Sequence, residues 1–139
     1  MRFLIASDED RPVVLHVASV LRERGHEASV FPAGPWAKVA TEVARAVARG
    51  DADQGVVCCW TGTGVTMAAN KVRGIRAALC GDAATAAGAR KWNDANVLGL
   101  SLRLLSEPLA TEIVQAWLDA EYTGSEAASL AVLAESEAG

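Results

Sequence analysis

A cysteine and a glycine-rich turn stand together in the segment Cys59–Lys71. This segment reads Cys-Trp-Thr-Gly-Thr-Gly-Val-Thr-Met-Ala-Ala-Asn-Lys and follows an apolar run that predicts a buried strand. A small turn that links a strand to a helix leaves N–H groups free at the helix start, where they and the helix dipole stabilise an anion. The segment therefore predicts a site for a phosphate or an enediolate, although the same glycine spacing also occurs in plain tight turns.

Cys59 is the residue of this segment best suited to act as a base. It stands where the predicted strand ends and the helix begins, and a helix start favours the thiolate form of a cysteine. The alternative is a small buried apolar residue, which is what most free cysteines are. Cys58 fits that alternative better, because successive strand residues point to opposite faces and the two cysteines should not share one role.

Other polar residues lie close to predicted strands. Asp8 follows the first apolar run, Arg103 follows the last one, and Asn93 precedes the last one. A guanidinium at the carboxyl end of a strand can bind an anion through two hydrogen bonds. Structural roles are open as well, because aspartate commonly caps helices and asparagine forms turns. In the usual strand order of an open sheet, we expect Asp8 beside the Cys59 turn.

Short β-rich runs alternate with helical patterns along the chain and predict the fold class. The predicted strands are residues 3–6, 28–31, 55–59, 76–80 and 96–100. This alternation predicts an α/β protein with three layers, α/β/α, built on a Rossmann-like, doubly wound, five-stranded parallel sheet. We expect a single domain over residues 1–139. In such sheets, ligands bind beyond the carboxyl ends of the strands, where the strand order reverses.

The helical patterns carry recognisable start and stop signals. Apolar residues at helical spacing run from Trp36, on the apolar face, to Val47, and Gly50 suits the end of that helix. A final helix is expected at about 124–137. The predicted starts are an N-cap at Asp10, a helix opened by Ser106-Glu107-Pro108, and a capping box formed by Thr123 and Glu126.

Charge and composition argue against several classes of partner. Of all residues, 51% are hydrophobic and 22% are charged, as in folded globular proteins. The formal net charge of −4 comes without a Lys/Arg cluster, so we expect neither nucleic acid nor a membrane as a partner. Charge begins by Asp8, too early for a signal peptide or a membrane span, which predicts a cytoplasmic protein. The cysteines lack metal-ligand spacing, so no metal is expected.

Several motifs taken together resemble one family. They are an aspartate after the first strand, Cys59 followed by Thr-Gly-Thr-Gly and Ala-Ala-Asn-Lys, the strand Gly-Ile-Arg-Ala-Ala-Leu-Cys, then Trp-Asn-Asp-Ala-Asn-Val-Leu and the late Trp-Leu-Asp-Ala-Glu-Tyr. In this order they are similar to the ribose-5-phosphate isomerase B family, which includes the galactose-6-phosphate isomerase subunits. The resemblance covers nearly the whole chain. It implies aldose–ketose isomerisation of a small sugar phosphate without a metal or an organic cofactor.

The resemblance also implies roles for individual residues. Cys59 matches the family's catalytic cysteine, which moves a proton between C1 and C2 of the open-chain sugar, and Thr61 matches a residue linked to ring opening. Backbone N–H groups around Gly62 to Thr66 would hold the enediolate charge. The implied substrate-binding residues are Asp8, Glu9, Trp60, Gly62, Thr63, Gly64, Thr66, Trp92, Asn93 and Arg103. The family builds its site between two subunits, so a homodimer or a dimer of dimers is expected, with the C-terminal helix on or near the partner.

The chain departs from the family pattern around the reacting end of the sugar. Glu9 and Trp92 stand where the family has histidines, and Trp60 stands where it has glycine. Trp60 and Trp92 would give the pocket a more apolar, aromatic lining that can stack on a sugar face.

A second departure concerns the phosphate. Glu126 and Leu130 align with arginines that bind the phosphate in the family, while Arg103 is retained and Arg11 or Lys38 are further cations. Because unpaired like charges at close range disfavour a dianion, we hypothesise a modified or non-phosphorylated sugar, or a phosphate that is held differently.

Two other functions stay open. One is a catalytically silent module of the same fold that binds a sugar or sugar phosphate. The retained Cys59 and Thr61 favour the enzyme, whereas the replaced histidines and arginines favour the module. The other is a chain that acts only together with a paralogous subunit, as the galactose-6-phosphate isomerase subunits do.

Overall fold

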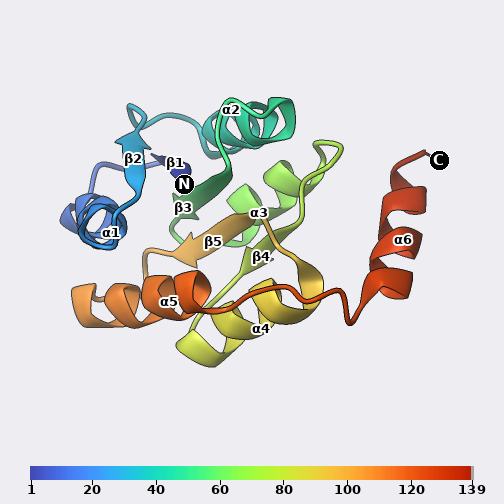
Figure 1. The fold of residues 1–139 in the computed structure, drawn as a ribbon. Helices are drawn as coiled ribbons and strands as arrows, with labels where there is room; N and C mark the ends of the chain where they lie inside the picture. The colour runs from blue at the N-terminus through green and yellow to red at the C-terminus, as the bar shows by residue number, and fades with distance from the viewer. Residues whose placement is uncertain (139) are drawn as a thin grey trace.

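In the computed structural model, which describes residues 1–138, a parallel sheet lies between two layers of helices (Figure 1). The strands are β1 (Arg2–Ser7), β2 (Glu27–Val30), β3 (Gln54–Cys59), β4 (Ala77–Leu79) and β5 (Val97–Ser101). The α-helices are α1 (Pro12–Glu23), α2 (Trp36–Arg49), α3 (Thr63–Asn70), α4 (Ala83–Asn93), α5 (Glu107–Asp119) and α6 (Ala127–Glu135), and a 3₁₀ turn, η1 (Ser136–Ala138), follows α6. Because every strand pair is parallel, the predicted doubly wound α/β sheet is confirmed.

The strand order places the reversal point of the sheet between β1 and β3. The order is β2-β1-β3-β5-β4, so the chain goes to one side of β1 for β2 and to the other side for β3. In the register, Ser7 pairs with Cys58, and Cys59 pairs with Ser101. The ends of β1, β3 and β5 therefore meet at one edge of the sheet, which we call the carboxyl edge. We call the opposite edge, where the strands begin, the amino edge.

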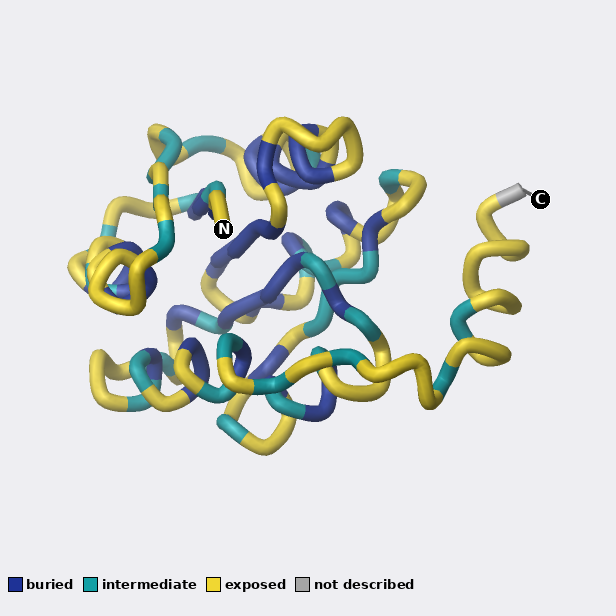
Figure 2. Tube along the Cα trace, viewed as in Figure 1, coloured by how far each residue is buried: buried dark blue, intermediate teal, exposed yellow. Residues whose placement is uncertain are grey.

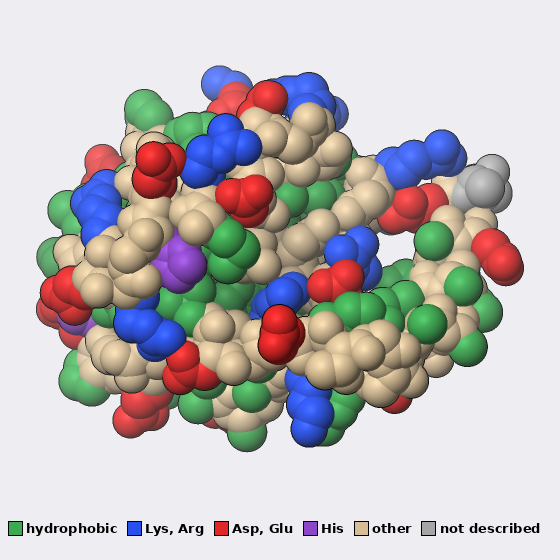
Figure 3. Space-filling model, viewed as in Figure 1, with side chains coloured by type: hydrophobic (Ala, Val, Ile, Leu, Met, Phe, Trp, Pro, Cys, Tyr) green, Lys and Arg blue, Asp and Glu red, His purple; other side chains and the backbone are tan. Residues whose placement is uncertain are grey.

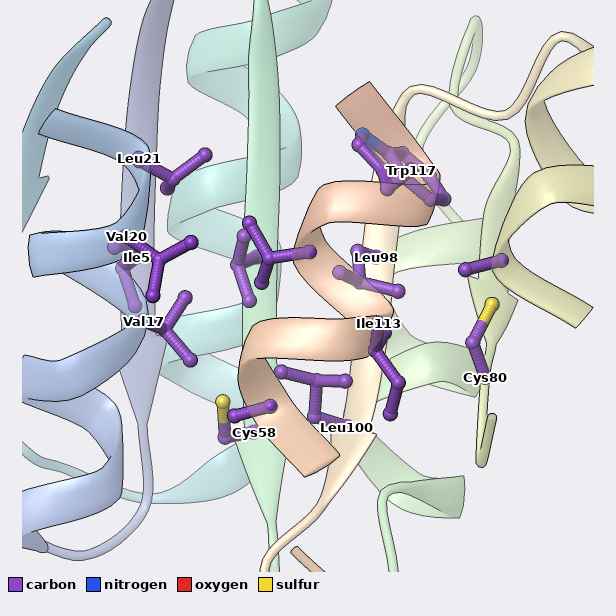
Figure 4. Close-up of a cluster of buried hydrophobic side chains, with 14 of the residues drawn as sticks. Ile5, Val17, Val20, Leu21, Cys58, Cys80, Leu98, Leu100, Ile113 and Trp117 are labelled. Atoms are coloured by element: carbon purple, nitrogen blue, oxygen red, sulfur yellow. The ribbon is translucent and has the colours of Figure 1, made fainter. Parts of the chain in front are cut away.

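The sheet buries a separate core on each face (Figure 2). On one face, α1, α4 and α5 cover side chains such as Leu98 and Trp117, both 2% exposed or less. On the other face, α2 and α3 cover Val57 and Val65. Figure 4 shows the first of these cores, in which Cys58 lies among apolar side chains. Burial on both faces explains why the strands are apolar almost throughout.

Two of the predicted helix signals are confirmed. Gly50 ends α2 with a φ of 83°, the left-handed conformation that favours glycine. Ser106 is the N-cap residue of α5, and its side chain accepts a hydrogen bond from the Leu109 N–H at 3.2 Å. Both signals depend only on residues within one turn of the helix end, so the sequence pattern was sufficient.

The other two predicted caps are wrong. Asp10 does not cap α1, because Pro12 takes the first helical position and Arg11 becomes the N-cap residue. Thr123 does not begin a capping box either. Gly124 follows it with a φ of 87°, which excludes a helical turn there, and the helix starts later at Ala127.

The C-terminal helix α6 stands apart from the layers (Figure 1). Within α6 no residue is buried, and Val132 and Leu133 are 62% and 51% exposed. The contacts that tie this end of the chain to the body include hydrogen bonds from Arg73 Nη2 to the Glu137 carbonyl (3.0 Å) and from the Gly74 N–H to Glu137 Oε1 (2.9 Å). A space-filling view shows the hollow between α6 and the body (Figure 3). Among the described helices, none is both long enough and apolar enough to cross a membrane.

Candidate active site

Cys59 is the last residue of β3 and lies at the carboxyl edge. Its side chain is 6% exposed and packs on the α2/α3 face, whereas Cys58 belongs to the core under α1 and α5. The predicted opposite orientation of the two cysteines is therefore confirmed. Burial raises the pKa of Cys58 to about 12, so this thiol stays protonated at neutral pH. Cys59 is the thiol that stands next to the glycine-rich turn.

The turn after Cys59 exposes backbone N–H groups at the start of α3. Gly62 is the N-cap residue, has a φ of 77° and has no side chain with which to cap the helix. The first helical hydrogen bond runs from the Thr66 N–H to the Gly62 carbonyl at 3.3 Å, and Thr66 Oγ1 donates to the same carbonyl at 2.7 Å. The N–H groups of residues 63–65 precede that bond and so lack a partner within the helix. The turn therefore presents free backbone N–H groups, and the anion site stays a prediction.

Gly62 is required here for space as well as for its backbone angle. A Cβ atom at this position would lie 2.5 Å from Leu79 Cδ1 and 2.9 Å from the Leu100 carbonyl oxygen. Thr61 and Thr63 line the exposed side of the turn, with their hydroxyl oxygens 2.8 Å apart. The turn is therefore held tightly on its inner side and presents hydroxyl groups on its outer side.

Asp8 lies beside this turn, as predicted from the strand order. Its N–H donates to the Cys58 carbonyl at 3.2 Å. Its Oδ1 atom is buried and has no hydrogen-bond partner among the described residues. Burial, and then the charge of Glu9, raise the pKa of Asp8. A buried acceptor without a partner in the protein is costly, so Oδ1 of Asp8 is a candidate acceptor for a ligand hydroxyl.

Trp60 and Arg103 complete the group of predicted residues at the carboxyl edge. The Arg103 N–H donates to the Trp60 carbonyl at 3.0 Å, which joins the end of β5 to the Cys59 turn. The Trp60 side chain is 50% exposed, and the guanidinium of Arg11 stacks on its ring. Arg11 is ion-paired with Glu9 at 2.7 Å. Trp60, Arg11 and Glu9 thus form one group of contacting side chains next to the turn.

Trp36 borders the Cys59 turn, although the sequence pattern did not identify it as a site residue. The helical pattern placed it on the buried face of α2, but it is 47% exposed. Its ring instead covers Gly64, where a Cβ atom would lie 3.0 Å from the indole. The available signal was an aromatic residue at the first position of a helix, although Trp36 also fits the apolar repeat.

Trp92 and Asn93 lie at the other edge of the sheet. They end α4, which runs back from the carboxyl edge to the amino edge, and Asn96 a few residues later accepts a hydrogen bond from the Gly55 N–H at the start of β3 (3.0 Å). They line the groove beneath α6 together with Glu126 and Leu130. One chain therefore does not bring Trp92 and Asn93 to the Cys59 turn.

The histidines and the acidic residues of the described chain form no further centre at this edge. His16 lies between Glu107 (3.1 Å) and Thr111 (2.7 Å), where α1 meets α5. His26 contacts the N-terminal amino group at 2.9 Å. Within residues 1–138, no group of three or more His, Cys, Asp or Glu side chains is arranged to hold a metal ion.

A thiol, an amide-lined turn and an unpartnered carboxylate thus converge where the strand order reverses. These features define an α/β protein with a candidate ligand site at the carboxyl edge of its sheet.

Comparison with known proteins identifies the family. The chain matches the model of the Ribose/Galactose Isomerase family over residues 4–132. It is 42% identical to ribose-5-phosphate isomerase B of Escherichia coli (strain K12) over 115 residues, which cover 78% of this chain and 76% of that protein. The chain therefore belongs to the Ribose/Galactose Isomerase family, and its named relatives are isomerases, as its motifs predicted.

Solved structures agree over the full length of the fold. The ribose-5-phosphate isomerase B of Clostridium thermocellum has a TM-score of 0.93 at 37% identity, with 99% of this chain and 98% of that chain covered. The ribose-5-phosphate isomerase B of Mycoplasma genitalium, solved with bound ribulose-5-phosphate, has a TM-score of 0.91 at 31% identity, with 99% and 96% covered.

Proposed function

We propose that this protein is an aldose–ketose isomerase of a small sugar phosphate or a related sugar, with Cys59 as its base. The observation that carries the proposal is the convergence of Cys59, the free N–H groups of residues 63–65 and the unpartnered Oδ1 of Asp8 at the carboxyl edge. Membership of an isomerase family supports the reaction type, and the bound ribulose-5-phosphate of the Mycoplasma genitalium relative supports a sugar phosphate.

The proposed reaction is a proton transfer through an enediolate. The Cys59 thiolate removes the proton from C2 of the open-chain aldose; the electron pair of that C–H bond forms the C1–C2 double bond, and the carbonyl π pair moves to O1. The hydroxyl proton on O2 then transfers to O1, the C2 carbonyl forms, and C1 takes the proton back from the Cys59 thiol, which gives the ketose. N–H groups of the turn hold the negative charge, and each such donor contributes roughly 3–4 kcal/mol in comparable oxyanion sites. Asp8 accepts a hydrogen bond from a sugar hydroxyl, and Thr61 assists ring opening.

We also propose that the complete site needs two copies of the chain. Trp92 and Asn93 lie at the amino edge, and β3 spans about 17 Å between the two edges at the usual rise per residue. A small sugar bound at Cys59 does not reach that far within one chain. The exposed Val132 and Leu133 of α6 are an apolar surface for a second copy to cover. A homodimer or dimer of dimers is the simplest assembly, and a paralogous second chain is the alternative.

The proposal is tested by solvent deuterium exchange into sugars, followed by NMR. Exchange reports proton abstraction even where the equilibrium hides net conversion. We expect exchange at C1 or C2 of one sugar or sugar phosphate with the wild type, and none with Cys59→Ala. Cys58→Ala is the matched control, because it removes the neighbouring thiol from the opposite face. Undiminished exchange in Cys59→Ala would overturn the assignment of the base.

A catalytically silent binding module is the second candidate. The position of the histidines favours it, since His16 and His26 are engaged away from the Cys59 turn and supply no imidazole for ring opening there. Calorimetric titration of the same sugars separates the two functions. Binding without exchange across the panel would establish the module. The predicted cytoplasmic location and the single-domain organisation stay predictions.

A further inference from the structure

An ion pair between Glu9 and Arg11 stands beside the Cys59 turn. Arg11 Nε donates to Glu9 Oε2 at 2.8 Å, and Arg11 Nη2 is 2.7 Å from the same oxygen. The guanidinium carbon lies 5.2 Å from the centre of the Trp60 ring, which is a cation–π distance. Both contacts go to one carboxylate oxygen, and Nη1 donates to no acceptor within residues 1–138. The guanidinium therefore keeps donors available for a ligand.

The pair connects the two loops that meet at the reversal point of the sheet. Arg11 lies on the loop after β1, and Trp60 follows Cys59 directly, so its Cα is about 3.8 Å from that of Cys59. Glu9 and Arg11 also line a cavity of about 340 Å³ at the end of β1. The apolar part of its lining is Pro12, Val14, Leu15, Val30, Phe31 and Ala33. Space for a ligand group thus adjoins the guanidinium.

We propose that Arg11 binds the anionic group of the substrate and that Glu9 is the counter-ion which this group replaces. The inference rests on the proposed function and deepens it, because it names Arg11 as the residue that selects a substrate by its anionic group. Trp60 holds the plane of the guanidinium on one side. The substrate anion accepts the hydrogen bonds of Arg11 Nε and Nη2 in place of Glu9 Oε2.

The energetics favour this exchange of partners. The Arg11 and Glu9 side chains are 39% and 46% exposed, and ion pairs with that exposure contribute little to stability. Rotation of Glu9 into solvent is therefore easy. A phosphate or carboxylate can accept two parallel hydrogen bonds from a guanidinium, whereas Glu9 offers it a single oxygen. Stacking on Trp60 keeps the guanidinium in place, so less side-chain freedom is lost on binding.

The surrounding charges explain why the anion replaces Glu9 instead of joining it. Asp8 lies beside the pair, and Asp10 lines the same cavity. An anion added to the intact pair would face all of these carboxylates with one guanidinium. Departure of Glu9 removes the nearest of them. Glu9 consequently weakens the binding of every anion and excludes those that bind Arg11 through one oxygen only.

A second ion pair in the chain serves as a matched control. Arg49 and Asp51 have the same separation in sequence as Arg11 and Glu9, and Arg49 Nε lies 3.0 Å from Asp51 Oδ2. Both side chains are 61% exposed, and the pair lies at the end of α2, at the amino edge. Among the described aromatic residues, none stacks on Arg49.

The test is calorimetric titration of inorganic phosphate, at low ionic strength, into the full-length wild type, Arg11→Gln, Arg11→Lys, Glu9→Gln and Arg49→Gln. We expect Arg11→Gln to weaken binding roughly ten- to hundredfold, the range for loss of hydrogen bonds to a charged group. Arg11→Lys should weaken phosphate binding less, because the positive charge stays while the paired donors of the guanidinium are lost. Glu9→Gln should tighten binding, and Arg49→Gln should leave it unchanged.

Equal affinity in the wild type and Arg11→Gln, or no saturable binding by the wild type, would overturn the inference. Circular dichroism of each variant establishes that the fold is intact, and Arg11→Lys keeps the test valid if Arg11→Gln is unstable. Deuterium exchange into sugars reports the isomerase separately. Arg11-dependent phosphate binding without exchange in any sugar would refute the proposed function and leave the anion site. Deuterium exchange without Arg11-dependent phosphate binding would support the isomerase and refute the anion site at Arg11.

Discussion

A mixture of two inactive variants should recover activity if the site is built from two copies of the chain. Cys59 marks the carboxyl edge and Asn93 marks the amino edge, so in a two-copy site each residue comes from a different subunit. Cys59→Ala and Asn93→Ala should each lower turnover strongly when pure. In a dimer that contains one subunit of each kind, one site receives both intact residues and the other site receives both replacements.

The expected magnitude follows from the random pairing of subunits. When equal amounts of the two variants are unfolded and refolded together, about half of the dimers are mixed, and half of their sites are intact. The mixture should therefore regain about a quarter of wild-type turnover. The assay is the rate of deuterium exchange into the substrate before and after co-refolding, with a tag on one variant to isolate mixed dimers.

A control pair makes the experiment decisive. Thr61 lies on the same turn as Cys59, so a mixed dimer of Cys59→Ala and Thr61→Ala contains no intact site. That mixture should stay at the low activity of its components. If the Cys59→Ala and Asn93→Ala mixture stays equally low, or if Asn93→Ala alone is fully active, the two-copy site is refuted.

Two further predictions concern the residues that shape the carboxyl edge. The pKa of Asp8 is raised in the folded state, so ionisation of this carboxyl lowers the stability of the fold as pH rises. Asp8→Asn should therefore increase the melting temperature at pH 7. This gain should vanish below pH 3.8, the ordinary pKa of aspartate, because the carboxyl is then protonated in both the folded and the unfolded state. A melting temperature that is unchanged or lower at pH 7 would contradict the burial argument. Gly62→Ala should cost more free energy of unfolding in urea than Gly50→Ala, which shares a positive φ (77° and 83°) but meets nothing within 4 Å. The shared backbone strain is about 1–3 kcal/mol, and equal losses would show that the contacts of Gly62 are unimportant.

The sequence by itself determined the class of fold and the main chemical candidates. Apolar runs predicted the strands because a strand buried on both faces has few polar positions, and this relation is local. The opposite orientation of Cys58 and Cys59 followed from the two-residue period of a strand. Gly50 and Ser106 predicted helix ends because their conformational and hydrogen-bonding preferences act within one turn.

Predictions failed where a neighbouring residue overrode a local preference. Asp10 is a good N-cap type, yet Pro12 fixed the first helical position one residue later than that assignment requires. Trp36 fits the apolar repeat of α2, yet the absence of a side chain at Gly64 opened a place for its ring outside the core. Each outcome depends on two segments at once, which a pattern within one segment does not describe.

Beyond the pairing of Asp8 with Cys59, which the usual strand order predicted, only the tertiary structure decided which candidates share a site. Asp8, Cys59 and Arg103 are far apart in sequence but meet because the strand order β2-β1-β3-β5-β4 aligns the ends of β1, β3 and β5. Trp92 and Asn93 are separated from them because α4 carries the chain back across the sheet before β5 begins. Residue types and spacing identify groups that can do chemistry, whereas the order and direction of the strands determine which of those groups one ligand can touch.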